Sequence, residues 1–215
     1  MKTTQLLLAS IAMAAPLSGA VIFSDSTFST APVALPTYTE GIDSHNTYYT
    51  SGAQHFVVDT GVGSAAPSLR AGAFGTSLIL VLPSSGTAET WNFSYDLMAS
   101  SSWGDRAFEI IGLASGNTID NNSALYGGNT TTSGTFILDT QFANDTSGSF
   151  TAQSYQLTIP SGLTGVAFRW FTDGDANKRY IDNITVSTVE VPEPAMFAAS
   201  FALIALIFAR FRRQH

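Results

Sequence analysis

The chain of 215 residues contains no cysteine, which excludes disulfide bonds, zinc–thiolate sites and a thiol nucleophile. Histidine is nearly as scarce, with only His45, His55 and His215, and no Gly-x-Ser-x-Gly sequence is present. A serine hydrolase needs a nucleophile beside a histidine base, and a histidine metal site needs several ligands at regular spacing. The sequence indicates neither arrangement, so we expect a protein that is not an enzyme.

Charged residues are also few, at 12% of the chain, and basic residues are the rarer kind. Between residues 21 and 190 there are 15 acidic and 5 basic residues, which gives this region a net charge of −10. An acidic surface repels phosphate backbones, so a nucleic-acid partner is not expected. The same region is rich in Ser, Thr, Gly and Asn, a composition typical of short strands joined by polar turns.

No stretch of the region 21–190 shows the amphipathic pattern of a helix of three turns. Apolar and polar residues alternate instead over 91–97, 155–159 and 166–170, as half-buried strands require. Further strands are expected over 55–59, 69–74, 77–82, 106–113, 135–139 and 179–187, with a first strand near 21–23. The sequence therefore predicts one all-β domain over 21–190, a β-sandwich or jelly roll, with a closed barrel as the alternative.

The first 20 residues have the pattern of a secretory signal peptide. Lys2 is followed by an apolar stretch over 6–15, and Pro16 ends that stretch. Ser18-Gly19-Ala20 supplies the small residues that a signal peptidase accepts, so cleavage is expected after Ala20. The alternative is an uncleaved N-terminal anchor, which the short apolar stretch disfavours.

The last 25 residues consist of three parts in a fixed order. Pro192-Glu193-Pro194 comes first and keeps the chain extended, because proline blocks helix growth. An uncharged run of 15 residues over 195–209 follows, long enough for a helix of ~22 Å that predicts one transmembrane segment. The basic end, with Arg210, Arg212 and Arg213, is expected to stay in the cytoplasm and leave the body outside.

These three parts resemble the PEP-CTERM sorting tail of bacterial exosortase substrates, a tail also labelled the ice-binding protein C-terminal domain. The resemblance covers residues 191–215 only. It implies recognition and cleavage by a membrane-embedded exosortase, followed by delivery of the body to the cell surface or the exopolysaccharide matrix. An ordinary C-terminal membrane anchor is the alternative.

A second resemblance concerns the segment 179–186, Arg-Tyr-Ile-Asp-Asn-Ile-Thr-Val. It looks like the final strand of secreted jelly-roll modules of the galactose-binding and carbohydrate-binding kinds. This resemblance is limited to one strand and implies a fold, not a ligand.

Polysaccharide binding is the best functional hypothesis for the body. Aromatic rings stack on the apolar faces of sugars, and polar loops supply hydrogen bonds. The candidate residues are Tyr48, Tyr49, Trp103 and Tyr126, which stand outside the alternating segments. The alternative is that these four rings pack over the ends of the sandwich.

Calcium is the one cofactor that the sequence suggests, and only as a structural ion. Asp173, Asp175 and Asn177 place oxygen atoms at alternate positions of one loop, as a calcium loop does. A plain Asp-Gly turn between two strands explains the same residues without a metal.

Two further functions remain open at this stage. A secreted glycoside hydrolase would need a pair of carboxylates, and the candidates are Asp96, Asp105, Glu109 and Asp182. A structural coat protein without a ligand would need no site at all.

Overall fold

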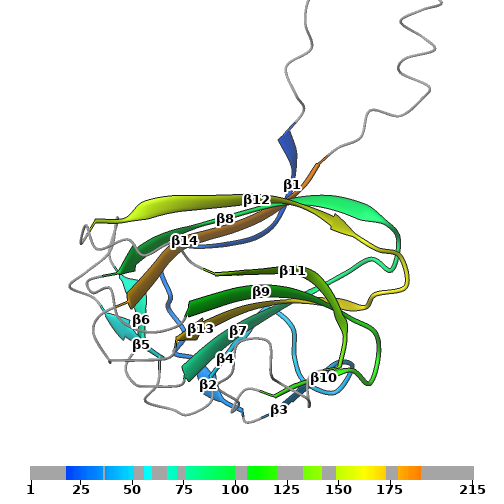
Figure 1. The fold of residues 1–215 in the computed structure, drawn as a ribbon, viewed down its shortest axis with the longest axis horizontal. Coiled ribbons are helices and arrows are strands. Elements are labelled where there is room, and N and C mark those ends of the chain that lie inside the picture. The colour runs from blue at the N-terminus through cyan, green and yellow to red at the C-terminus, as the bar shows by residue number, and fades with distance from the viewer. Residues whose placement is uncertain are drawn as a thin grey trace, which may run out of the picture.

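The computed structural model describes residues 18–35, 37–50, 56–59, 67–71, 76–99, 106–120, 133–141, 149–172 and 179–189. Within these ranges every regular element is a strand, and two six-stranded sheets face each other across an apolar core (Figure 1). The predicted β-sandwich is therefore confirmed, and the alternative of a closed barrel is wrong. Among the described residues, no helix has the length and apolar character needed to cross a membrane. Residues 1–17 of the predicted signal peptide (1–20) and the predicted sorting tail (191–215) lie outside these residues.

The first sheet, here called sheet A, is built around the last strand of the chain. Its spatial order is β12 (Thr151–Ile159), β8 (Glu89–Ala99), β14 (Arg179–Val189), β6 (Ser68–Ala71) and β5 (Phe56–Asp59). The first strand, β1 (Ser18–Asp25), also pairs with β14, alongside its C-terminal half. All pairings of β1, β6, β8 and β12 in this sheet are antiparallel.

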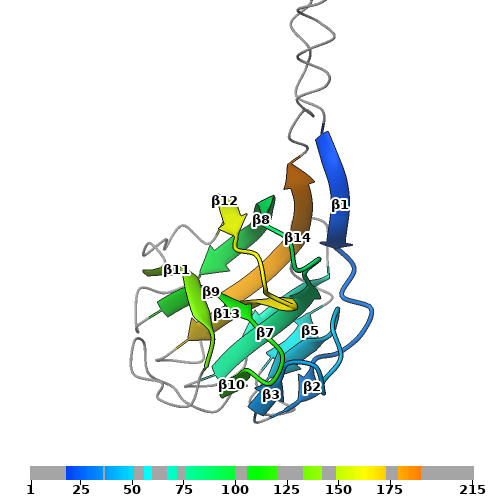
Figure 2. The same ribbon diagram turned by 90° about the vertical axis from the view of Figure 1, so that its right-hand side faces the viewer.

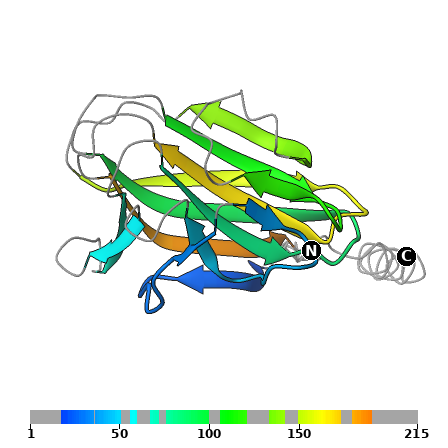
Figure 3. The same ribbon diagram turned by 90° about the horizontal axis from the view of Figure 1, so that it is seen from below.

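The second sheet, sheet B, has one parallel pair at its edge. Its order is β11 (Thr135–Gln141), β9 (Arg106–Leu113), β13 (Gly165–Thr172), β7 (Thr76–Pro83), β4 (Tyr48–Thr50) and β2 (Val33–Ala34), with β2 parallel to β4. A separate two-stranded sheet, β3 (Thr37–Thr39) and β10 (Thr118–Asp120), accompanies it. Figure 3 shows β1, in blue, and β11, in yellow-green, at opposite lateral edges of the sandwich.

Alternation of apolar residues along the strands produces the core between the sheets. The side chains that the sequence assigns to one face of β8 and β13 are all buried there: Trp91, Phe93, Tyr95, Leu97, Val166, Phe168 and Trp170. Phe93 lies at the centre, with ring centroids at 4.4 Å from Phe168 and 5.4 Å from Phe108. This aromatic stack holds the two sheets together.

A second, smaller core covers the opposite face of sheet B. It contains Ile79, Val81, Ile111, Leu113 and Ala167 from the sheet, together with Tyr38, Tyr49 and Ile119. Tyr38 and Ile119 belong to β3 and β10 and are fully buried, so this two-stranded sheet covers part of the outer face of sheet B. Sheet B therefore has apolar side chains on both faces, whereas the exposed alternate residues of β12 leave the outside of sheet A polar.

The two chain ends of the domain leave it at the same place. Ser18 pairs with Val189, and Val21 pairs with Ser187, so β1 and the end of β14 emerge side by side (Figures 1 and 2). The strand β1 crosses the predicted cleavage point after Ala20. A chain that starts at Val21 would keep the pairings of Phe23, Ser24 and Asp25 with β14.

Replacement of Phe93 by alanine tests the aromatic stack. Phe93 is fully buried and also contacts Tyr95, Tyr155 and Trp170. We expect Phe93→Ala to lower the free energy of unfolding by about 3–5 kcal/mol, measured by denaturant titration. Its exposed neighbour Asn92 provides the control, because Asn92→Ala should change that energy by about 0.5 kcal/mol or less. A loss below about 1 kcal/mol for Phe93→Ala would contradict this account of the core.

Candidate functional site

A pocket of about 370 Å³ lies at the lateral edge of the sandwich, where β1 of sheet A faces β4 of sheet B. Its volume is in the lower part of the range for small-molecule sites, roughly 300–1,000 Å³. Three short segments form its walls: the end of β1, the turn that follows β1, and the residues that lead into β4. The lining residues are Phe23, Ser24, Asp25, Thr27, Ser29, Thr30, Asn46, Thr47 and Tyr48. We call it the edge pocket.

Asp25 shapes the first wall by closing the turn after β1. Its Oδ1 accepts hydrogen bonds from the backbone N–H of Thr27 at 3.0 Å and of Phe28 at 2.8 Å, the pattern of an Asx turn. Phe28 sits at φ 41°, a conformation that is unusual for a bulky side chain, and its ring is buried against Tyr48 at 5.9 Å. The turn thus stores backbone strain beside the pocket, and the packing of Phe28 offsets it.

The second wall is held by a buried carboxylate in the neighbouring loop. Glu40 is buried and accepts a hydrogen bond from the Tyr38 hydroxyl at 3.0 Å, while His45 Nε2 lies 3.1 Å from both of its oxygens. The carboxylate rests on Gly165, where an added Cβ would come within 2.3 Å of Glu40 Oε2. These contacts fix the loop that ends at Asn46.

Asn46 itself enters the pocket wall in a left-handed conformation. Its φ is 57°, and its backbone N–H donates to the carbonyl of Val81 at 2.8 Å. Asparagine tolerates this conformation better than most residues. Two of the three non-glycine residues with positive φ in the described part of the chain, Phe28 and Asn46, therefore flank the edge pocket. Strained residues of this kind are concentrated at binding sites in proteins.

Two aromatic rings supply the apolar part of the pocket. Phe23 and Tyr48 meet edge to face, with centroids 6.2 Å apart. Tyr48 is only 6% exposed, and its buried hydroxyl has no hydrogen-bond partner among the described residues. Burial raises the pKa of this hydroxyl, and the nearby Asp25 carboxylate raises that pKa further. Tyr48 therefore stays protonated, with its buried hydroxyl close to the Asp25 carboxylate.

The polar groups around these rings are suited to a ligand with many hydroxyls. The hydrogen bonds that Asp25 accepts within its turn all end on Oδ1, and its carboxylate also interacts with the nearby Tyr48 hydroxyl. The exposed side-chain amide of Asn46 has no partner among the described residues. The pocket thus offers an acceptor, an amide and several Ser and Thr hydroxyls beside two rings, and it contains no set of groups for covalent chemistry.

The structure describes two of the four aromatic residues that the sequence analysis proposed for ligand binding. Tyr48 and Tyr49 were expected in a loop, but they form β4 and are 6% and 5% exposed. Because successive residues of a strand point to opposite faces, Tyr48 packs into the main core and Tyr49 into the outer core. Neither ring is an open stacking surface, so that expectation is wrong. Tyr48 borders the edge pocket instead. Trp103 and Tyr126 lie outside the described residues.

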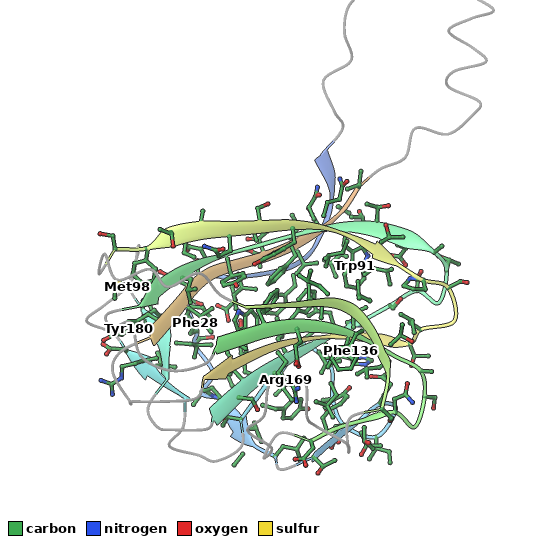
Figure 4. All side chains as sticks on the ribbon, viewed as in Figure 1. Phe28, Trp91, Met98, Phe136, Arg169 and Tyr180 are labelled. Carbon is green, nitrogen blue, oxygen red and sulfur yellow. The ribbon has the colours of Figure 1, made fainter. Side chains whose placement is uncertain are left out.

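Of the four carboxylates proposed for a hydrolase, the structure describes Asp96, Glu109 and Asp182. On the outer face of sheet B, Arg169, which is labelled in Figure 4, donates through Nε to the buried Glu109 carboxylate at 2.6 Å. Asp96 and Asp182 face each other across β8 and β14, on the outer face of sheet A. Asp182 is fully buried and out of reach of a polymer chain. Asp96 and Glu109 therefore lie on opposite sides of the sandwich and cannot flank one bond. Asp105 is outside the described residues.

The proposed calcium loop, with Asp173, Asp175 and Asn177, also lies outside the described residues. Within the described ranges, no three His, Cys, Asp or Glu residues are grouped as metal ligands. A second pocket of about 260 Å³ lies where the chain leaves the sandwich after β14 and has no aromatic wall. Its lining consists of Ala88, Glu89, Thr90, Thr158, Thr188 and Val189.

Sequence reasoning missed the edge pocket because its walls come from distant segments. One local signal was available: Asp25-Ser26-Thr27 is a typical Asx-turn sequence at the end of a strand. The strand β4 has only three residues. Its pairing with β7 and the position of Asn46 depend on contacts with distant segments, which a local sequence pattern does not show.

No protein-family model and no curated protein matches the chain. Several solved structures are similar to the chain over most of its length. The xylan-binding domain CBM22-1 of Xyn10C from Paenibacillus barcinonensis aligns with a TM-score of 0.48 and 11% identity, over 81% of this chain and 97% of that domain. The K3 cleaved adhesin domain of Lys-gingipain from Porphyromonas gingivalis aligns with a TM-score of 0.47 and 13% identity, over 78% and 99%. At these scores, the alignments transfer no ligand to this chain.

Two tyrosine variants test whether the Tyr48 hydroxyl is unused in the free protein. Removal of a hydroxyl without a partner should leave the free energy of unfolding of Tyr48→Phe within about 0.5 kcal/mol of the parent value. Tyr38→Phe is the matched control, because it takes a donor from the buried Glu40 and should cost about 1–3 kcal/mol. Equal losses for the two variants in denaturant titration would show that Tyr48 has a hydrogen bond in the folded protein.

Proposed function

We propose that this protein is exported, is held in the membrane by residues 191–215 until an exosortase processes that tail, and binds extracellular polysaccharide through its β-sandwich. The body acts without catalysis, as a surface or matrix component. The observation that carries the binding part is the edge pocket, where the Asp25 carboxylate, the Asn46 amide and several Ser and Thr hydroxyls lie beside the ring of Phe23.

The position of the chain ends supports the sorting part of the proposal. The last described residue of β14, Val189, stands three positions before Pro192. The Pro-Glu-Pro motif is thus close in sequence to the end of the sheet, and its prolines favour an extended peptide of the kind that a processing enzyme binds. Because β1 and β14 end together, a signal peptide and a sorting tail would tether the same end of the domain.

The alternative hydrolase is disfavoured by the positions of Asp96 and Glu109 on opposite faces of the sandwich. The other alternative, a coat protein without a ligand, differs from the proposal only in lacking saturable binding. A binding measurement therefore separates the two remaining functions.

The sorting tail is tested by the triple variant Pro192→Ala, Glu193→Ala, Pro194→Ala, expressed in the native cells. We expect the parent protein to be released or matrix-bound with an intact mass that ends near residues 190–194, while the triple variant stays in the membrane. Pro160→Ala, which changes a proline in an exposed turn of the body, should behave like the parent. If parent and triple variant both keep residues 195–215 in the membrane, the tail is only an anchor.

The binding part is tested by blocking the edge pocket. Ser29 lines this pocket and is exposed, so Ser29→Trp should fill it and reduce polysaccharide binding on a glycan array by about tenfold or more. Ser161→Trp places the same side chain in another exposed turn and should bind like the parent. Unchanged binding by Ser29→Trp would move the site elsewhere, and an absence of saturable binding in the parent would favour the coat protein.

A further inference from the structure

We propose that the edge pocket holds one uncharged sugar unit of the polysaccharide and rejects uronic acids, with the Asp25 carboxylate as the group that discriminates between them. This inference rests on the proposed function and adds the class of ligand. It goes beyond that function because the sugar units of polysaccharides can be neutral or acidic, and polysaccharide binding by itself favours neither class.

The charge of the edge pocket decides which class of sugar unit it binds. Among the lining residues that the structure describes, Asp25 alone carries a formal charge, and none is basic. Its Oδ1 is committed to the turn at Thr27 and Phe28, so Oδ2 is the oxygen available to a ligand. A carboxylate can accept hydrogen bonds from two neighbouring hydroxyls of a sugar. A second carboxylate in the same pocket meets Coulomb repulsion that short distance and partial burial strengthen.

The remaining groups match the parts of one sugar ring. The half-buried ring of Phe23 borders the pocket and offers a small apolar surface for the C–H face of the sugar. The exposed Asn46 amide is both donor and acceptor, and the Ser and Thr hydroxyls of the lining supply further donors and acceptors. The volume of about 370 Å³ is near the lower limit for small-molecule sites, which favours a single unit at a chain end or branch over a long segment.

The test compares neutral and acidic methyl glycosides on the full chain. The protein is kept in a detergent without a sugar headgroup, at roughly 0.15 M salt, where charges beyond ~8 Å are screened. The probes are the methyl glycosides of glucose, galactose and mannose, and those of glucuronic and galacturonic acid, measured by saturation-transfer NMR and calorimetry. We expect a neutral glycoside to bind with a dissociation constant on the order of 1 mM, and the matching uronate at least about tenfold more weakly.

Asp25→Asn tests the source of the discrimination. Asparagine keeps an Oδ1 that can accept the turn hydrogen bonds, but it replaces the anionic Oδ2 by an amide N–H₂. We expect this variant to bind uronates about as well as neutral glycosides. Asp43→Asn is the matched control, because Asp43 also accepts a backbone hydrogen bond, from Thr39 at 2.7 Å, and does not line the pocket. It should keep the parent ratio.

Three results would overturn this inference: equal binding of neutral and acidic glycosides by the parent, an unchanged ratio in Asp25→Asn, or no binding of any neutral probe. The array with Ser29→Trp separates these failures from a failure of the proposed function. If Ser29→Trp loses polysaccharide binding while the glycoside ratio is flat, the edge pocket is the site and only its selectivity is wrong. If Ser29→Trp binds like the parent, both the site and its selectivity are wrong.

Discussion

The placement of β14 in the middle of sheet A is the constraint on which the rest of the structure depends. On one side β14 pairs with β8 along most of its length, and on the other side it pairs first with β6 and then with β1. The last strand of the chain is therefore flanked by strands from near its start. Until β14 arrives, β1 and the β6–β5 pair have no position relative to β8. Long-range pairing of this kind is slow and must wait for the whole domain, so an exported chain would complete its fold only after residue 189 has crossed the membrane.

On one side of β14 the paired strand changes from β6 to β1 at a local irregularity. The same irregularity positions the carboxylates of Asp182 and of Asp96, which faces it. The register with β8 shifts between Asp182 and Thr185, and Asn183 adopts φ 50°, as at a β-bulge. The backbone N–H of Asn183 donates to Asp182 Oδ1 at 2.8 Å, and its side-chain amide donates to Asp96 Oδ2 at 2.7 Å. One asparagine thus bridges two carboxylates that face each other, a pair that would otherwise be destabilising. Asp96 and Asp182 thus stabilise the bulge of β14 through Asn183.

The sequence predicted the long strands because their burial follows a period of two. Phe93, Phe168 and Trp170 were assigned to the core correctly, and β9 has the predicted bounds 106–113. Prediction failed where a strand is too short to show a period. Tyr48 and Tyr49 look like loop residues, and only their pairing with Leu80 and Ile79 of β7 makes them a strand. The edge pocket was missed for the same reason, since Asp25 and Asn46 meet only after both sheets have formed.

The geometry of β1 relates the edge pocket to the tail. The N-terminal end of β1 lies beside Val189, where the chain leaves the sandwich, whereas Asp25 pairs with Ile184 and borders the pocket. Seven residues separate Ser18 from Asp25, which at about 3.3 Å per residue amounts to roughly 23 Å along the strand. A domain tethered by its tail would therefore hold the pocket about that far from its attachment point, beyond the ~8 Å range of surface charge at physiological salt. Under the proposed function, Asp25 would then bind its ligand without interference from an anionic membrane surface.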